Sequence, residues 1–270
     1  MLGSAVYGVL NKKYDLVLGI RNAEKADLLK KRFGEADRVK IVPFDAAHIY
    51  QEHAAKKGFP SEFVAQFLRQ VGDVDRVINA VGVTIPFALR DPAMTFFVNG
   101  ALPHILAERF GEKLIHITTD CVYNGKDSFP YDENSRKSPT DLYGLSKSMG
   151  EPASCLTIRT SIIGRELDGY TGLLEWFLQQ RGRTITGFAE HYWNGITTQQ
   201  FGKHDRRCDN DRLQVVNSVF VFACAKQIDE DRCVQERRGH SSTPSNECLP
   251  LLSSRIFLNS WVATTMARAS

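Results

Sequence analysis

The chain has 270 residues, of which 43% are hydrophobic, and a formal net charge of +3. This length allows one large domain or two small ones. The charges are mixed along the sequence and form no clustered basic face of the kind that binds nucleic acids. Apolar runs such as Val77–Val83 are too short to span a bilayer, and the N-terminus lacks a signal-peptide pattern. The six cysteines have no metal-ligand spacing. We therefore expect a cytoplasmic protein with free thiols and no metal, nucleic-acid or membrane partner.

Short apolar runs alternate with amphipathic segments as far as about residue 163. The runs predict strands at Leu16–Ile20, Val39–Pro43, Arg76–Val81, Lys113–Thr118 and Leu156–Ile162. The segments between them predict helices at Ala23–Phe33, Ser61–Val71, Pro92–Phe110 and Thr140–Gly150. Regular β-α alternation is typical of a parallel sheet with helices on both faces. We therefore predict an α/β fold with a Rossmann-type, doubly wound parallel sheet, formed by residues 1–163.

Residues 164–203 have a different pattern, which we interpret as part of a small substrate-binding lobe. Thr171–Gln180 predicts a helix, Arg181–Gly182 a turn, and Thr184–Gly187 a short strand. Thr197 and Gln200 have the spacing of a capping box, which would begin another helix that runs towards Lys203.

Residues 204–270 differ in composition from the rest of the chain. They contain one of the 20 glycines, none of the eight tyrosines, and four of the six cysteines. These cysteines form no CxxC pair, which speaks against a metal-binding module: Cys208, Cys224, Cys233 and Cys248. We expect an irregular tail produced by out-of-frame translation or a replaced terminus, and resequencing the coding DNA tests this.

The first residues match the end of a glycine-rich dinucleotide loop, with Gly3 as its third glycine. Arg21 lies 18 residues after Gly3, at the end of the predicted strand Leu16–Ile20. In Rossmann units the residue at this position contacts the adenosine ribose. An arginine there suits a 2′-phosphate, which favours NADPH over NADH. On this interpretation the first strand of the usual order 3-2-1-4-5-6 is missing, because it would precede Met1. Losing four or five buried aliphatic side chains would cost about 6–15 kcal/mol, against a typical stability of about 5–15 kcal/mol.

Tyr143 and Lys147 are spaced to share one face of a helix. An ammonium group beside a phenol lowers the phenol pKa from about 10 and allows general acid–base catalysis near neutral pH. The predicted strand Lys113–Thr118 runs directly into Thr119. Because ligands bind at the carboxyl ends of the strands in such sheets, we expect Thr119 to hydrogen-bond a substrate carbonyl beside Tyr143.

Two further segments contribute polar or small residues near this edge. Asn79, Ala80 and Val81 end the predicted strand Arg76–Val81, where small side chains would lie along a cofactor. Asn99 lies inside the predicted helix Pro92–Phe110, and we expect it to hold a water molecule or a backbone group.

Together these segments resemble the extended short-chain dehydrogenase/reductases and, within them, the dTDP-4-dehydrorhamnose reductase-like proteins, over about residues 1–203. The matching pieces are Met1–Ala5, Asn79–Val81, Val98–Gly100, Thr118–Tyr123, Tyr143–Lys147 and Arg159–Gly164. Two loop glycines of the family pattern are absent, and the tail replaces most of the family's sugar-binding lobe.

The resemblance implies that NADPH, or else NAD, delivers hydride to C4 of a dTDP- or UDP-linked 4-keto-6-deoxy sugar. It assigns catalysis to Thr119, Tyr143 and Lys147. It assigns cofactor binding to Gly3, Arg21, Asn79, Ala80, Val81, Asn99, Tyr143 and Lys147. It assigns substrate contacts to Asp120, Val122 and Trp193, whose ring would stack on the sugar or the base. A nucleotide-sugar substrate is thus expected, and a homodimer remains open.

Other functions also remain open. Related dehydratases carry Thr-Asp-Glu at the strand end, whereas Cys121 follows Asp120 here, so the acid needed for water elimination is missing. Epimerases share the tyrosine and the lysine but retain NAD. The regulatory subunit of methionine adenosyltransferase resembles these reductases and serves as a binding partner. An inactive product of a truncated or frameshifted gene is the last alternative.

Overall fold

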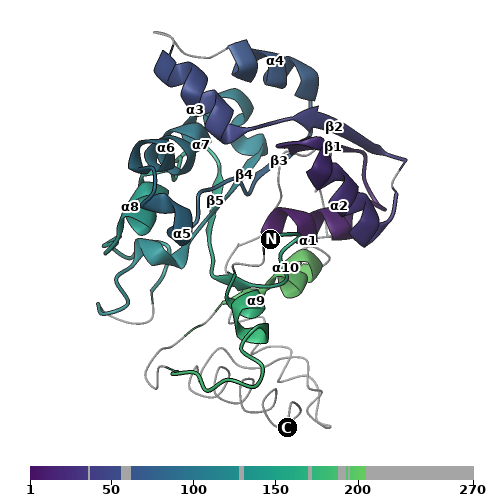
Figure 1. The fold of residues 1–270 in the computed structure, drawn as a ribbon. Helices are drawn as coiled ribbons and strands as arrows, with labels where there is room; N and C mark the ends of the chain where they lie inside the picture. The colour runs from purple at the N-terminus through teal and green to yellow at the C-terminus, as the bar shows by residue number, and fades with distance from the viewer. Residues whose placement is uncertain are drawn as a thin grey trace, which may run out of the picture.

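The computed structural model describes residues 1–35, 37–55, 62–127, 131–169, 172–187, 193 and 195–204 (Figure 1). Residues 205–270 lie outside the described part, and with them almost all of the predicted irregular tail. The predictions for those residues therefore stay predictions.

The strands of the main sheet are parallel, as the β-α alternation predicts. They are β1 (Leu16–Ile20), β2 (Val39–Pro43), β3 (Val77–Asn79), β4 (Leu114–Thr118) and β5 (Leu156–Arg159). β1 pairs with β2, and β4 lies between β3 and β5. The bounds of β1 and β2 agree with the prediction. β3 is shorter because the Asn79 side chain accepts a hydrogen bond from the backbone N–H of Val81, which turns the chain away from the sheet.

No ladder joins β1 to β3 among the described residues, yet both strands belong to one layer. Leu18 of β1 and Ile78 of β3 lie in the first hydrophobic core cluster. Val17 and Val77, on the opposite face, lie in the second. The order β2-β1, then β3-β4-β5, corresponds to the expected 3-2-1-4-5-6 with a break at the position of strand 1.

Helices cover both faces of this layer (Figure 1), which confirms the predicted doubly wound, Rossmann-type fold. The first core contains side chains of α1 (Leu2–Leu10), α2 (Ala23–Phe33) and α10 (Thr198–His204). The second contains side chains of α3 (Ala46–Ala55), α4 (Glu62–Val71), α7 (Leu102–Phe110) and the π-helical turn Phe97–Ala101, and α6 (Pro92–Phe96) packs at its margin. In the part of the chain described, no helix is both long enough and apolar enough to cross a membrane.

The remaining elements are turns, helices and strands of two to eight residues, and they include the helix that carries Tyr143 and Lys147. These elements are α5 (Ile85–Ala88), the 3-10 turns Gly111–Lys113 and Asp120–Val122, α8 (Leu142–Met149), β6 (Ile162–Ile163), α9 (Leu173–Leu178) and β7 (Ile196–Thr197). β6 and β7 form a separate parallel pair.

The capping box predicted at the start of the last helix is present. The backbone N–H of Gln200 donates to Thr197 Oγ1 at 3.1 Å, and the Gln200 side chain accepts from the Thr197 N–H at 2.9 Å. The helix that follows, α10, packs against α1 and buries Phe201 in the first core. The end of the segment 164–203 therefore returns to the main domain.

The strand predicted at Thr184–Gly187 is wrong. These residues form no strand and are mostly exposed, so no burial stabilises an extended conformation there. The predicted turn before them is present, since Gly182 has a φ of 77°. The strand of this region lies further on, at β7, where β6 supplies a hydrogen-bonding partner.

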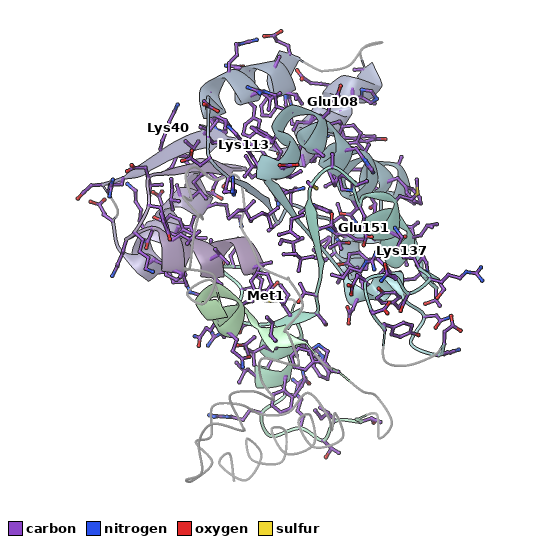
Figure 2. The ribbon with its side chains drawn as sticks, turned by 180° about the vertical axis from the view of Figure 1, so that it is seen from behind. Met1, Lys40, Glu108, Lys113, Lys137 and Glu151 are labelled. Atoms are coloured by element: carbon purple, nitrogen blue, oxygen red, sulfur yellow. The ribbon has the colours of Figure 1, made fainter. Side chains whose placement is uncertain are left out.

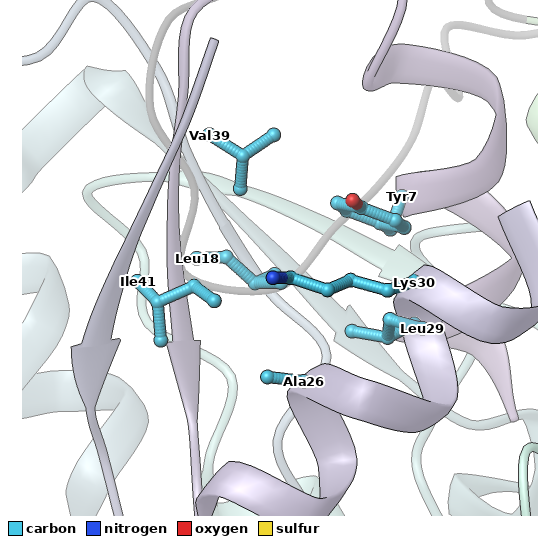
Figure 3. A pocket seen from close by; sticks show the side chains of 7 residues that line it. All are labelled: Tyr7, Leu18, Ala26, Leu29, Lys30, Val39 and Ile41. Carbon is cyan, nitrogen blue, oxygen red and sulfur yellow. The ribbon is translucent and has the colours of Figure 1, made fainter. Parts of the chain in front are cut away.

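A small cavity lies between α1, α2 and the β1–β2 pair (Figure 3). Its volume is about 40 Å³, and its lining is largely apolar: Tyr7, Leu18, Ala26, Leu29, Lys30, Val39 and Ile41. None of the predicted site residues lines it, so it has no part in the chemistry considered below.

Candidate functional site

The structure brings Thr119 and Tyr143 together, as the sequence predicts. Thr119 follows β4 directly and is buried, with 6% of its surface exposed. Tyr143 lies in the first turn of α8, whose start is fixed by Asp141: its side chain accepts a hydrogen bond of 2.6 Å from the Gly144 N–H. The Thr119 hydroxyl lies close enough to the Tyr143 phenol to favour its ionisation. Two proton-carrying hydroxyls therefore meet at the carboxyl end of β4.

Lys147 lies one helical turn after Tyr143 and is also buried, with 6% of its surface exposed. Its Nζ lies against Gly82, where an added Cβ would stand only 2.6 Å from it. Within the described ranges, Nζ makes no hydrogen bond or ion pair. Burial therefore lowers the pKa of Lys147 from 10.5 to about 8.

The Tyr143 phenol is harder to ionise than the sequence predicts. Burial raises the pKa of Tyr143 to about 12, and the hydrogen bond from Thr119 only partly opposes this effect. Nearby Cys121, Asp120 and Asp141 raise it further. Burial therefore outweighs the lowering of the pKa that the sequence predicts from Lys147. At neutral pH Tyr143 is protonated, as an acid that donates a proton must be.

Two buried asparagines hold the loop that follows β3. Asn79 Oδ1 accepts from the Val81 N–H at 3.0 Å. Asn99 Oδ1 accepts from the Val83 N–H at 2.8 Å, and its Nδ2 donates to the Val83 carbonyl at 3.0 Å and to Ser146 Oγ at 3.0 Å. The amides are thus bonded to protein groups. Asn99 thus holds a backbone group, as predicted. Both side chains position the loop, in which Ala80 and Val81 are partly exposed, and their contacts with a cofactor stay a prediction.

His116 is a functional candidate that the sequence reasoning missed. It is fully buried in β4, and its Nδ1 lies 3.1 Å from Asn79 Nδ2. Because Asn79 Oδ1 already accepts from Val81, its Nδ2 must donate to His116, which assigns the imidazole proton to Nε2. Burial, with smaller effects from the charges of Lys147 and His104, lowers the pKa of His116 to about 3, so the ring is neutral. A single histidine inside an aliphatic strand was the available signal.

The residues predicted to bind substrate differ in their availability. Val122 is fully buried, and its backbone carbonyl accepts from the Ser138 N–H at 2.8 Å. Its predicted substrate contact is therefore wrong for the side chain, which packs inside the protein. Asp120 is partly exposed, and its Oδ1 accepts from Thr119 Oγ1 at 3.2 Å, so it adjoins the reactive pair. Trp193 donates from Nε1 to Ser161 Oγ at 2.7 Å, and its stacking on a sugar or base stays a prediction.

The residues predicted to bind the outer part of the cofactor lie on the first strand and helix. Arg21 is exposed at the carboxyl end of β1, immediately before the N-cap residue of α2. Gly3 lies in the first turn of α1, which is helical from Leu2 onwards, and is partly exposed. Among the described residues, no group of histidine, cysteine or acidic side chains is arranged to hold a metal ion.

We expect Gly144→Ala to disturb the site strongly. A Cβ at Gly144 would stand 2.3 Å from the Cys121 carbonyl oxygen, so α8 and the turn after β4 would have to move apart. The expected loss of stability is about 1–3 kcal/mol, measured by urea unfolding. Gly100→Ala is the matched control, because its nearest neighbour would be 3.6 Å away, and it should be neutral or slightly stabilising. Equal stability of the two variants would contradict this close approach.

Sequence comparison relates the central part of the chain to a known family. The RmlD substrate binding domain family matches residues 59–166. A dTDP-4-dehydrorhamnose reductase from Burkholderia thailandensis is 37% identical over 97 residues, which are 32% of this chain and 33% of that protein. The chain aligns with about a third of the length of the curated relatives it matches. The resemblance seen in the sequence is confirmed over this segment.

Structural comparison supports the same fold over more of the chain. A dTDP-4-dehydrorhamnose reductase from Bacillus anthracis, solved in complex with NADP, has a TM-score of 0.52 at 18% identity and covers 78% of this chain and 75% of its own. A variant UDP-glucuronic acid 4-epimerase from Bacillus cereus, solved with a fluorinated substrate analogue and NAD, has a TM-score of 0.57 at 17% identity. This second match covers 91% of this chain and 82% of the epimerase.

Proposed function

We propose that this chain, similar over residues 59–166 to the RmlD substrate binding domain, is an NADPH-dependent reductase of a nucleotide-linked 4-keto-6-deoxy sugar. The observation that carries the proposal is that Thr119 lies beside Tyr143 at the end of β4, with Lys147 one turn further along α8. Oxidoreductases of the short-chain type use this set of groups, and several curated relatives that share the segment are named as dTDP-4-dehydrorhamnose reductases.

The residues present fit a nicotinamide dinucleotide. β3 runs parallel to β4, so the residues that follow these two strands lie at one edge of their sheet. At this edge Gly82 is exposed and has no side chain, and Lys147 stands directly behind it. Arg21 is exposed at the end of β1, where it could bind the 2′-phosphate of the adenosine ribose. The cofactor supplies the hydride that reduces the carbonyl carbon.

The chain's own groups handle the proton. Thr119 orients the ketone oxygen, and Tyr143 donates its phenolic proton to that oxygen as negative charge develops on it. The high pKa of Tyr143 keeps the proton in place until it is needed. Lys147, whose Nζ lies beside Gly82, would hold the ribose hydroxyls of a bound cofactor and would supply positive charge to that part of the site.

Two measurements test this function. NADPH and NADH are first titrated against the purified chain while the nicotinamide fluorescence is followed. NADPH consumption is then measured with dTDP-4-dehydrorhamnose. We expect saturable binding with NADPH preferred and turnover that requires the keto sugar. Binding without any turnover of nucleotide-linked 4-keto sugars would overturn the reductase proposal and favour a binding module.

We expect Arg21→Ala to weaken NADPH binding about tenfold, equivalent to about 1.4 kcal/mol, and to leave NADH binding unchanged. The reason is that only NADPH carries the 2′-phosphate for which the guanidinium provides charge-assisted hydrogen bonds. Fluorescence titration with each cofactor measures the change. Arg38→Ala, which removes an exposed arginine that is paired with Asp15, is the control. An equal effect on both cofactors would contradict a role in selecting NADPH.

A nucleotide-sugar 4-epimerase is the second candidate, favoured by the structural match to the Bacillus cereus epimerase. Such an enzyme keeps NAD bound through its reaction cycle. Tightly bound NAD in the denatured protein, together with sugar interconversion that consumes no NADPH, would support the epimerase over the reductase.

A further inference from the structure

The two proposed reactive hydroxyls stand at opposite ends of one connecting segment. Thr119 precedes the segment, at the end of β4, and Tyr143 follows it, in the first turn of α8. Between the 3-10 turn Asp120–Val122 and the start of α8, the described residues 123–127 and 131–141 form no helix or strand. The geometry of the pair therefore depends on how this connecting segment is anchored.

Arg159 provides an anchor from the neighbouring strand. It ends β5 and is the ladder partner of Thr118, the residue before Thr119. Its guanidinium binds both carboxylate oxygens of Glu151, with Nε to Oε1 at 3.0 Å and Nη2 to Oε2 at 2.8 Å. The Glu151 side chain is 6% exposed and lies just after the end of α8. This ion pair ties the far end of the catalytic helix to the sheet.

The remaining donors of Arg159 hold the connecting segment itself. Nη1 donates to the Tyr123 hydroxyl at 2.5 Å and to the Glu133 carbonyl at 3.1 Å. Tyr123 in turn donates to the Asp132 carbonyl at 2.7 Å, and its ring stacks on Tyr131 with centroids 4.4 Å apart. One guanidinium thus joins both described limbs of the segment.

Lys137 adds a third attachment near the end of the segment. Its Nζ donates to Glu151 Oε2 at 3.1 Å and to the Ser148 carbonyl at 3.1 Å. Figure 2 shows Lys137 and Glu151 next to each other. Glu151 is therefore shared by Arg159 and Lys137, which joins the segment, helix α8 and strand β5 at one point.

We propose that Arg159 is a positioning residue that fixes the segment between Thr119 and Tyr143 and so sets the geometry of these two hydroxyls for catalysis. The proposal rests on the proposed reductase function. Arginine is required because only a planar fork of five N–H donors binds a carboxylate through two bonds and still reaches two more acceptors. A lysine keeps the charge and loses the fork, so Arg159→Lys isolates the positioning effect from the charge.

The test compares Arg159→Lys with wild type, and Arg69→Lys serves as control because Arg69 forms an exposed pair with Glu62. We expect kcat for the keto sugar to fall about tenfold to a hundredfold, because small displacements of reacting groups cause losses of this size. The dissociation constant of NADPH should not change, since Arg159 lies outside the proposed cofactor contacts. Glu151→Gln, which keeps a hydrogen-bond acceptor for the guanidinium, should show a smaller fall and provides a second variant if the first fails to fold.

A second readout does not depend on activity. Cys121 lies in this segment near Tyr143, and burial raises the pKa of its thiol. Its labelling by a thiol reagent, followed by peptide mass analysis, should accelerate in Arg159→Lys, while Cys155 labels at the wild-type rate. Unchanged kcat and unchanged Cys121 labelling would overturn the proposal, and so would equal acceleration at both cysteines, which indicates general loosening. If wild type reduces no keto sugar, the proposed function fails, and the labelling alone decides the positioning role.

Discussion

Tyr143→Phe is expected to lower keto-sugar turnover by about 10²- to 10⁴-fold, the usual contribution of a general acid. The phenol lies beside Thr119, and phenylalanine keeps the ring while removing the only proton that Tyr143 offers to the ketone oxygen. NADPH binding should stay within twofold of wild type, because the ring and Lys147 remain. NADPH consumption at saturating cofactor measures the turnover.

Tyr50→Phe is the matched control for this substitution. Tyr50 packs against Phe97, with ring centroids 5.7 Å apart, and lies at the margin of the second core, away from the candidate site. It should reduce the keto sugar at the wild-type rate. Wild-type turnover by Tyr143→Phe would show that another group protonates the product, and would remove Tyr143 from the proposed chemistry.

Much of the fold was predictable because its strands and helices carry strong local patterns. β1 and β2 are short β-branched runs, and α2 ends with basic residues before a glycine of positive φ, so their bounds agree with the prediction. Among the described helices, the short α5 and two longer ones, α3 and α1, were not predicted. α3 buries only Ile49 and therefore shows no apolar stripe. α1 was interpreted as the end of a loop, although Leu2, Val6 and Leu10 have helical spacing and are buried.

The site was predictable in its members and less so in their contacts. Tyr143 and Lys147 follow from an i, i+4 pair and Thr119 from a strand end, both of which are local patterns. The direction of Lys147 depends on the space beside Gly82, which belongs to a loop more than sixty residues earlier in the chain. The roles of His116 and Arg159 depend on hydrogen bonds between neighbouring segments, which one sequence does not reveal. Burial also raises the pKa of Tyr143, whereas the spacing of Tyr143 and Lys147 predicts a lowered pKa.

Lys147→Met is expected to lower turnover about 10²-fold or more and, at the same time, to stabilise the fold near neutral pH. The buried ammonium has no ion-pair partner in the described part of the chain, so folding must remove an uncompensated charge from water. The folded-state pKa of Lys147, about 8, lies below its ordinary value of 10.5. Between these two values the unfolded chain binds more protons, so the stability of wild type rises with pH across this window.

The gain from Lys147→Met should therefore be greatest below the folded pKa of about 8 and should vanish above 10.5. Its size is about 1–3 kcal/mol, which urea unfolding at neutral and alkaline pH measures. Lys113→Met is the control, because Lys113 is an exposed residue paired with Asp73, and its removal should change stability by less than about 1 kcal/mol at either pH. A destabilised Lys147→Met protein at neutral pH would mean that the ammonium is stabilised where it lies. Lys147 would then impose no stability cost, and the fall of activity expected as the pH rises through about 8 should also be absent.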